Sequence, residues 1–213
     1  MSEQMNLQKT NNNDKQEEEF NLIDEILDWI ESFVFASFMV LLIFIFLFRT
    51  VVVDGDSMNP TLFTTQRLIL MHFNYTPERG DIIVFNSPGI NKTLIKRCIG
   101  LPGDKVTIDY NSDEVTVNGE LLDESYLGTG LDMFDSITTF DGAYCLGDSK
   151  YEYEVPEGTV FAMGDNRNNS RDSRAGDVGF VEYDDILGKA WFRFYIGKDY
   201  NGSKNPGNIG FLK

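Results

Sequence analysis

The sequence has few of the residues on which metal sites, disulfide frameworks and histidine-based catalysis depend. Its 213 residues include one histidine, His72, and two cysteines, Cys98 and Cys145. A zinc site needs three or four His, Cys or carboxylate ligands, and no suitable cluster is present, so we expect no metal and no cofactor. Two cysteines do not make a disulfide framework, and both a single bridge and two unpaired thiols remain open.

Basic residues are also scarce, and they are not clustered. The chain has 18 Lys and Arg against 34 Asp and Glu, a formal net charge of −16. Residues 1–31 hold nine acidic and two basic residues, and residues 109–157 hold thirteen and one. The acidity therefore belongs to a tail and an insertion. No stripe of Lys and Arg of the kind that binds nucleic acid is present, so we expect no nucleic-acid partner.

The sequence contains one long apolar run, residues 33–48, which only Ser37 interrupts. With Trp29 and Ile30 before it and residues 51–53 after it, the segment reaches ~20 residues, enough to cross a bilayer. Because the run is apolar all round, it favours a transmembrane helix over a soluble core helix. A cleavable signal peptide is the alternative, but acidic residues precede the run and no small-x-small cleavage site follows closely.

Short strand patterns separated by Gly and Pro turns predict a mainly β fold after the membrane segment. We divide the chain into a disordered acidic tail (1–19), an amphipathic lead-in with the transmembrane helix (20–50), a catalytic β domain (51–108 and 158–213) and a small β-rich acidic insertion (109–157). Asn118-Gly119 predicts a hairpin turn in the insertion. Residues 123–150 read as loop. Strands are expected at 67–73, 82–85, 93–99, 106–108, 115–117, 159–163 and 186–196.

Ser57 lies among small and turn-forming residues (54–62) just after the apolar run. A serine hydroxyl is a poor nucleophile until a neighbouring base takes its proton. His72 is one candidate base, although it lies in an apolar strand and Ser57 lacks the surroundings of a nucleophile elbow. Lys96 is the other, because in a strand it shares a face with Leu94 and Cys98, and apolar surroundings lower the pKa of a lysine. From these residues alone, a solvated Lys-Arg pair at 96–97 stays open.

Three stretches taken together resemble, in order, the motifs of bacterial type I signal peptidases. The first is S-M-x-P-T-L from Ser57, the second is K-R-x-x-G-x-P-G-D from Lys96, and the third is G-D-N-R-x-x-S-x-D-S-R from Gly164. The R-G-D-I-I-V-F stretch at 79–85 and the G-K-A-W-F-R stretch at 188–193 are similar to the same family. The resemblance covers roughly residues 20–197.

The resemblance implies a membrane-anchored serine endopeptidase that removes signal peptides from exported preproteins after Ala-x-Ala. It makes Ser57 the acylated nucleophile and Lys96 the general base, with Ser170 orienting the lysine. Asp172 and Arg174 match a supporting ion pair, and Arg97 with Asp165 is expected to add a second. The substrate is expected to bind as an added strand. Candidate walls of its shallow pockets are Met58, Leu62, Leu94 and Ile95.

The resemblance also implies that the catalytic domain lies on the extracytoplasmic side of the cell membrane. The charges that flank the apolar run weakly oppose that orientation, because Arg49 follows the run and only Lys15 precedes it within reach. Some members of the family use a serine two residues before the nucleophile as an oxyanion donor, and Gly55 occupies that position here. We therefore expect a backbone or water donor, and expect Gly55→Ser to retain or raise activity.

Two other functions fit the same features. One is a Ser–Lys relative that cleaves only itself or a narrow set of partners. The other is an inactive membrane-tethered β domain that binds exported polypeptides, a reading that the intact Ser57 and Lys96 disfavour.

Overall fold

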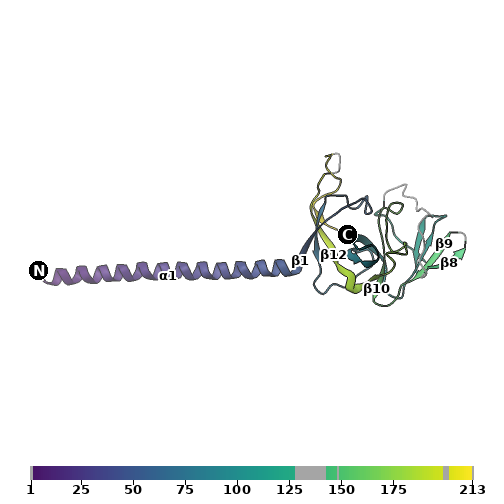
Figure 1. Cartoon of the computed structure of the whole chain (residues 1–213). Helices are drawn as coiled ribbons and strands as arrows, with labels where there is room; N and C mark the ends of the chain where they lie inside the picture. The colour runs from purple at the N-terminus through teal and green to yellow at the C-terminus, as the bar shows by residue number, and fades with distance from the viewer. Residues whose placement is uncertain (1, 128–142, 148, 199–201, 213) are drawn as a thin grey trace. The chain divides into compact units, whose positions relative to one another are not determined.

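The structure is a computed structural model of the chain, and it describes residues 2–127, 143–147, 149–198 and 202–212. It divides into two compact units, Met1–Phe46 and Leu47–Lys213, which are described separately here (Figure 1). The first unit is helical and the second is built from antiparallel strands. The expected fold class, a mainly β protein with one N-terminal apolar helix, is confirmed.

Helix α1 runs from Ser2 to Leu47. Its segment Leu22–Phe46 has a mean hydropathy of 2.3 and is the one described helix that is long and apolar enough to cross a membrane. The large apolar side chains along this segment are exposed, as in a helix that faces lipid. The span begins earlier in the chain than the sequence predicted, and residues 51–53, which we had added to it, leave the helix altogether.

Helix α1 includes residues 2–19, for which the sequence predicts a disordered tail, and that disorder stays a prediction. This segment contains no Gly or Pro and is rich in Glu, Gln, Lys and Met, which are good helix formers. Extending an existing helix costs much less than starting one, so a stable apolar helix can propagate into such a neighbour.

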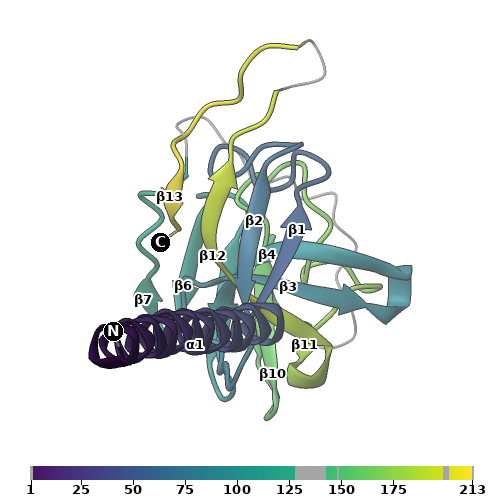
Figure 2. The same cartoon turned by 90° about the vertical axis from the view of Figure 1, so that its left-hand side faces the viewer.

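The larger sheet of the second unit has eight antiparallel strands in the order β1-β2-β12-β3-β4-β10-β11, with β13 paired to β12. Figure 2 shows β1, β2 and β12 side by side. Strand β1 was not predicted, because the sequence assigned its apolar residues Phe48, Val51 and Val52 to the membrane span. The strands are β1 Phe48–Val52, β2 Arg67–Met71, β3 Ile82–Ser87, β4 Lys92–Gly100, β10 Thr159–Met163, β11 Val181–Glu182, β12 Ile186–Tyr195 and β13 Gly210–Phe211. Short 3-10 helices lie at Pro88–Ile90 and Tyr183–Asp185.

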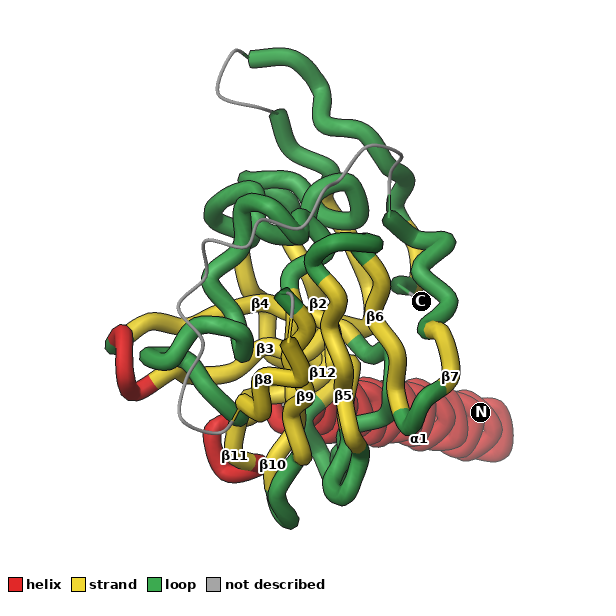
Figure 3. The backbone as a smooth tube through the Cα atoms, turned by 90° about the vertical axis from the view of Figure 1, so that its right-hand side faces the viewer, coloured by secondary structure: helices red, strands yellow, loops and turns green. Residues whose placement is uncertain are grey.

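The smaller sheet has five antiparallel strands in the order β7-β6-β5-β9-β8, and β5, β6 and β9 can be followed in Figure 3. The predicted turn joins β6 to β7, with φ of 54° at Asn118 and 83° at Gly119. Two strands, β8 and β9, lie partly in the region predicted as loop; residues 128–142 of that region are outside the described residues. The strands are β5 Lys105–Asp109, β6 Glu114–Val117, β7 Glu120–Leu121, β8 Ala143–Gly147 and β9 Lys150–Glu154.

The two sheets share one hydrophobic core, which joins the insertion to the catalytic β domain. Val106 and Val115 of the small sheet and Tyr153 of β9 pack in the same cluster as Ile99 and Phe161 of the large sheet. The small sheet begins with β5. The predicted boundary at residue 109 falls at the last residue of this strand and not between two elements. A shared core means that the insertion can influence the geometry of the larger sheet.

Candidate active site

The loop between β1 and β2 presents the Ser57 hydroxyl at the edge of the larger sheet. Met58 and Leu62 anchor the loop, because both side chains are buried against residues of β2 and β3. The Leu62 amide donates to the Met58 carbonyl oxygen at 2.9 Å, and the Asn59 amide donates to the Asp56 carbonyl oxygen at 3.1 Å. Ser57 itself is partly exposed. The fold thus fixes the backbone of this loop and leaves its serine accessible.

The side chain of Lys96, in β4, ends against Ser57. Its Nζ lies 2.7 Å from Ser57 Oγ and 3.0 Å from the carbonyl oxygen of Ile95, and both contacts are hydrogen bonds. Lys96 is only 2% exposed. Burial lowers the pKa of Lys96 to about 8, although Asp172 raises it and Arg174 lowers it further. A substantial fraction of this amine is therefore neutral near pH 8 and able to accept a proton from a neighbouring hydroxyl.

The next residue of β4, Arg97, is paired with a carboxylate. Its Nε and Nη2 donate to the two oxygens of Asp165 at 2.9 and 2.7 Å, and its Nη1 donates to the carbonyl oxygen of Gly80 at 2.7 Å. Thr61, from the Ser57 loop, donates its hydroxyl to the same carboxylate at 2.5 Å. This cluster joins three segments: the strand that carries Lys96, the loop after β10 and the loop that carries Ser57.

The loop after β10 contains a second buried ion pair, between Asp172 and Arg174. The Arg174 Nε donates to Asp172 Oδ1 at 2.8 Å and its Nη2 donates to Oδ2 at 2.9 Å. The Gly164 amide donates to the same carboxylate at 2.9 Å. Burial raises the pKa of Asp172, but Arg174 and these hydrogen bonds outweigh burial and the pKa is lowered. Such a loop is fixed by its own charges rather than solvated as a surface turn.

The same loop contacts the Ser57 backbone at a point where only glycine fits. A Cβ atom on Gly164 would lie 2.1 Å from Ser170 Oγ and 2.5 Å from the Ser57 carbonyl oxygen. The Asn166 amide donates to that carbonyl oxygen at 3.0 Å, and its side chain donates to the Asp56 carbonyl oxygen, also at 3.0 Å. The loop after β10 therefore fixes the backbone of the nucleophile candidate directly.

Ser170 lies beside this contact, but its hydroxyl makes no hydrogen bond to Lys96. The oxygen is buried, and distance and angle give it no hydrogen-bond partner among the described residues. It nevertheless lies close enough to Asp172 to contribute to the lowered pKa of that carboxyl. The predicted hydrogen bond from Ser170 to the lysine is thus absent from the described hydrogen bonds in this state.

A groove beside Ser57 opens between β1 and the start of β4. Three of the four predicted wall residues, Met58, Leu94 and Ile95, line it. Leu62 does not: it is fully buried in the core cluster that contains Leu68. The full lining is Val51, Val52, Val53, Asp54, Gly55, Ser57, Met58, Thr93, Leu94 and Ile95.

Comparison with known proteins identifies the family of the chain. The family described as signal peptidase, peptidase S26, matches residues 26–195. The chain belongs to the signal peptidase S26 family. It is 42% identical to signal peptidase I P of Bacillus subtilis subsp. natto over 76% of this chain and 85% of the relative. It is 35% identical to signal peptidase IB of Staphylococcus aureus, strain COL, over 86% and 97%.

A solved structure of a signal peptidase I from Enterococcus faecalis is 31% identical to the chain, with a TM-score of 0.39; the match covers 54% of this chain and 97% of that one. Membership of the S26 family supports signal-peptide removal as the general activity of this chain. The N-terminal apolar helix fits a single-pass membrane anchor.

Other candidates from the sequence lie outside the S26 site. No hydrogen bond joins His72 to Ser57 among the described residues, and His72 Nδ1 is buried without a partner. Of the two alternatives that the sequence left open for Cys98 and Cys145, the structure has two unpaired thiols, the first buried and the second exposed. Burial raises the pKa of Cys98 to about 12, which leaves it a thiol at neutral pH. No group of three metal-ligating side chains occurs in the described ranges.

Gly55 adds a constraint that the sequence did not reveal. Its φ is 101°, a conformation that L residues rarely adopt, although a Cβ there would meet no atom within 4 Å. Any side chain at position 55 is therefore strained by the backbone, and the expectation that Gly55→Ser leaves activity intact is revised to a loss in loop stability.

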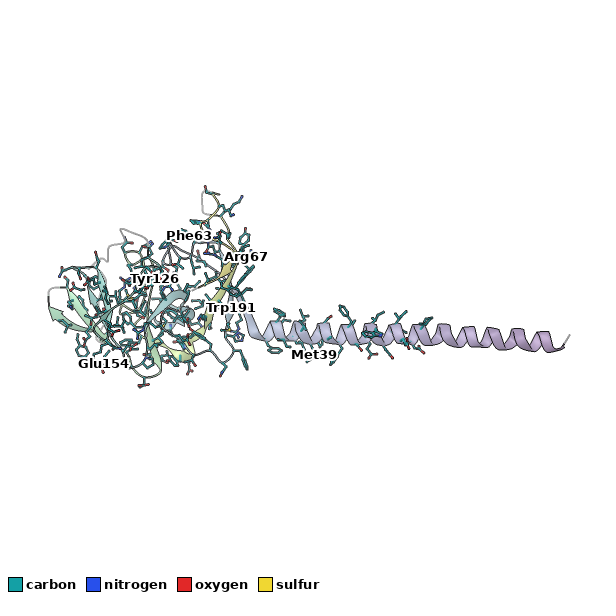
Figure 4. All side chains as sticks on the ribbon, turned by 180° about the vertical axis from the view of Figure 1, so that it is seen from behind. Met39, Phe63, Arg67, Tyr126, Glu154 and Trp191 are labelled. Carbon is teal, nitrogen blue, oxygen red and sulfur yellow. The ribbon has the colours of Figure 1, made fainter. Side chains whose placement is uncertain are left out.

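Sequence reasoning also missed two residues of the acidic insertion, Glu124 and Tyr126, which contact the arginines of this site. Figure 4 labels Tyr126 on the β unit. No motif in the sequence signals them, because their contacts join segments that are far apart in the chain.

Proposed function

We propose that the chain cleaves signal peptides from exported preproteins after Ala-x-Ala, with Ser57 as nucleophile and Lys96 as general base. The observation that carries the proposal is the 2.7 Å contact between Lys96 Nζ and Ser57 Oγ, made by an amine that is 2% exposed and has a pKa of about 8. A lysine works as a base only when it is neutral, and burial supplies that condition here.

The reaction follows from these two groups. The neutral Lys96 amine takes the Ser57 hydroxyl proton while Oγ attacks the scissile carbonyl carbon. The resulting ammonium gives its proton to the departing amine, the C–N bond breaks, and an acyl ester remains on Ser57. The Lys96 amine then takes a proton from water as the water attacks the ester. It returns that proton to Ser57 Oγ when the acid product leaves. Lys96 thus serves as base and acid in both halves.

The developing oxyanion needs fixed donors, and the Ser57 amide is the expected first one. The backbone of Ser57 is held by the Asn166 amide at its carbonyl oxygen, which supports a fixed orientation for its own N–H. Gly55 has no side chain to add a second donor, so that donor is backbone or water.

The substrate is proposed to bind as an extended strand in the groove beside Ser57. The groove is flanked by residues 51–55 on one side and Thr93–Ile95 on the other, and both flanks offer backbone groups for pairing. Leu94 and Ile95 are partly buried apolar walls, which suit the small side chains of an Ala-x-Ala sequence.

The catalytic unit is proposed to lie on the extracytoplasmic side, where the substrate's signal peptide emerges. Cys145 is exposed and Cys98 is buried, so Cys145 is a natural probe of topology. A membrane-impermeant maleimide added to intact cells should label the wild type but not Cys145→Ser. Labelling that requires membrane disruption would place the unit inside.

The dyad is tested with the full chain in detergent micelles and a preprotein carrying an Ala-x-Ala site. Ser57→Ala and Lys96→Ala should each abolish cleavage, whereas Lys105→Ala, which removes a lysine that is 54% exposed in β5, should not. A substrate with Phe in place of the final Ala should not be cut. Activity that survives Lys96→Ala refutes the proposed base, and cleavage of only the enzyme's own chain would favour the self-cleaving alternative.

A further inference from the structure

The segment that leads from the small sheet into the rest of the insertion, residues 122–127, lies against the arginines of the active site. Its start is anchored, since the Leu122 amide donates to the Val115 carbonyl oxygen at 2.9 Å and Leu122 packs on the shared core. Asp123 and a turn that closes at Leu127 shape the rest: Asp123 accepts from the Ser125 amide at 3.0 Å, and the Leu127 amide donates to the Glu124 carbonyl oxygen at 2.8 Å.

Tyr126 covers Arg97, the residue next to Lys96. The guanidinium carbon of Arg97 lies 3.9 Å from the centroid of the Tyr126 ring, so the ring stacks on the guanidinium while Asp165 binds its edge. Stacking and edge-on hydrogen bonds fix a planar guanidinium in all directions. The position of Arg97 in turn restrains the backbone of β4 where it carries Lys96.

Glu124 and the Tyr126 hydroxyl bind a second arginine, Arg167. The Tyr126 oxygen accepts from Arg167 Nη2 at 3.1 Å, and Glu124 forms an ion pair with the same nitrogen. Arg167 is 1% exposed, and its Nε donates to the Gly164 carbonyl oxygen at 3.2 Å. Gly164 lies against the Ser57 carbonyl oxygen. Asn166 of the same loop donates its backbone amide to that oxygen. The contacts therefore run without a gap from the insertion to the nucleophile.

The balance of buried charges also connects Glu124 to the active site. The buried arginines of the site number three, Arg97, Arg167 and Arg174, whereas the buried aspartates number two, Asp165 and Asp172. Glu124 supplies a third carboxylate. Burial raises its pKa despite the opposing effect of Arg167, so the charged form of Glu124 is not favoured by folding. Glu124 thus gives Arg167 the carboxylate partner that Asp165 and Asp172 give to Arg97 and Arg174.

We propose that Glu124 and Tyr126 are positioning residues of the active site, which hold Arg97 and Arg167 and thereby align Lys96 with Ser57. The inference rests on the proposed Ser–Lys mechanism. It gives the acidic insertion a role in catalysis, although the insertion contributes no group that touches the reacting atoms. The substrate groove is lined by other residues, so loss of these contacts acts on the chemical step and leaves substrate binding unchanged.

The test uses the full chain in micelles, with kcat expressed per active site titrated by an acylating ester, so that unfolded protein does not count. Tyr126→Ala should lower kcat roughly 10- to 100-fold and leave KM within about threefold, since small misplacements of reacting groups have effects of this size. Tyr126→Phe keeps the ring over Arg97 and should restore kcat to within roughly fivefold of the wild type. Glu124→Gln should lower kcat about tenfold.

Matched controls come from the same insertion. Glu120→Gln removes an exposed carboxylate of β7, and Tyr144→Ala removes an aromatic that is 61% exposed in β8. Both should match the wild type. Unchanged kcat in Tyr126→Ala, or a loss carried by KM, would each overturn the proposal. If Tyr126→Ala does not fold, unchanged kcat in Glu124→Gln overturns it.

Ser57→Ala and Lys96→Ala run in the same assay separate the two hypotheses. If either retains activity, the proposed mechanism fails and the positioning role fails with it. If both are inactive while the Tyr126 and Glu124 variants match the wild type, only the positioning role fails.

Discussion

Lys96 and Arg97 are consecutive cations of β4, and each is 2% exposed. They are stabilised in opposite ways. Arg97 has a carboxylate on its edge, since two of its nitrogens bind Asp165 at 2.9 and 2.7 Å. Lys96 binds only neutral oxygens, those of Ser57 and the Ile95 carbonyl. One strand thus buries a compensated charge and an uncompensated one side by side.

The difference supports the proposed role of Lys96 as a base in a site that does not use a histidine. A strand sends consecutive side chains to opposite faces, so the carboxylate that pairs with Arg97 does not bind Lys96 directly. Asp165 and Asp172 still raise the pKa of Lys96, but burial outweighs them. A direct carboxylate contact at Lys96 would hold the proton and abolish the base, whereas its absence at Arg97 would leave a permanent charge buried alone.

The largest expected effect comes from removing the uncompensated cation. Lys96→Met should lower kcat/KM at least 10²- to 10⁴-fold, the contribution of a general base. The same change should not destabilise the protein near pH 7, because it replaces a buried charge with an apolar side chain of similar length. Preprotein cleavage and urea unfolding followed at Trp191 measure the two. An active variant, or one that is several kcal/mol less stable, would break the comparison.

The second prediction removes the compensated cation. Arg97→Met leaves Asp165 buried without its partner and should destabilise the β unit by about 3–5 kcal/mol. The double variant Arg97→Met with Asp165→Leu should recover a large part of that loss, because no charge is then left alone. Urea unfolding of the full chain in micelles gives both values. A single variant as stable as the wild type would show that the pair is not the difference between the two residues.

The third prediction uses pH. The pKa of Lys96 is lowered from 10.5 to about 8 on folding, so the unfolded chain binds more protons between these values. Stability from this group is therefore full above the unfolded pKa and is lost as pH falls through about 8. The stability advantage of Lys96→Met over the wild type should shrink by about 2 kcal/mol from about pH 7 to about pH 9.5.

The activity of the wild type should also depend on the protonation state of Lys96. The kcat/KM of the wild type should rise with pH through about 8, as the amine loses its proton. Lys105→Ala is the control and should keep both profiles. A flat activity profile with no pH-dependent difference in stability would mean that Lys96 is not the titrating base.

The sequence alone separates the two faces of β4, because the period of a strand is two residues and Lys96 falls among apolar neighbours. The resemblance in three motifs then connected Ser57, Lys96 and the loop at 164–174. It did not locate Glu124 and Tyr126. Their contacts join residues 29 to 43 positions apart, and nothing in the composition of an acidic insertion distinguishes a docked segment from a solvated one.

The fold shows the same limit. Alternating or apolar strands such as β3, β4 and β12 were predictable, because burial imposes the pattern on them. Strand β1 was not, since its apolar residues follow a membrane segment of the same composition and only pairing with β2 distinguishes them. Strands β8 and β9 carry Tyr, Glu and Lys, and their pairing depends on the small sheet rather than on local propensity.

Replacing Ser170 should have the smallest effect. It sharpens the comparison because this hydroxyl lies near the Asp172–Arg174 ion pair and near the contact between Lys96 and Ser57. It is buried without a hydrogen bond to Lys96, and it lies against the same point as the Ser57 carbonyl oxygen. When Lys96 takes the Ser57 proton, its ammonium gains a donor that Ser170 Oγ can accept. Ser170→Ala should therefore lower kcat about tenfold, the value of one hydrogen bond to a charged group.

Because the bond forms only with the protonated lysine in the reacting complex, the rising limb of the kcat/KM profile should move little. Ser170→Thr retains the hydroxyl and is the matched control. A shifted limb with unchanged kcat would instead assign Ser170 to Asp172, the carboxylate whose pKa it helps to lower.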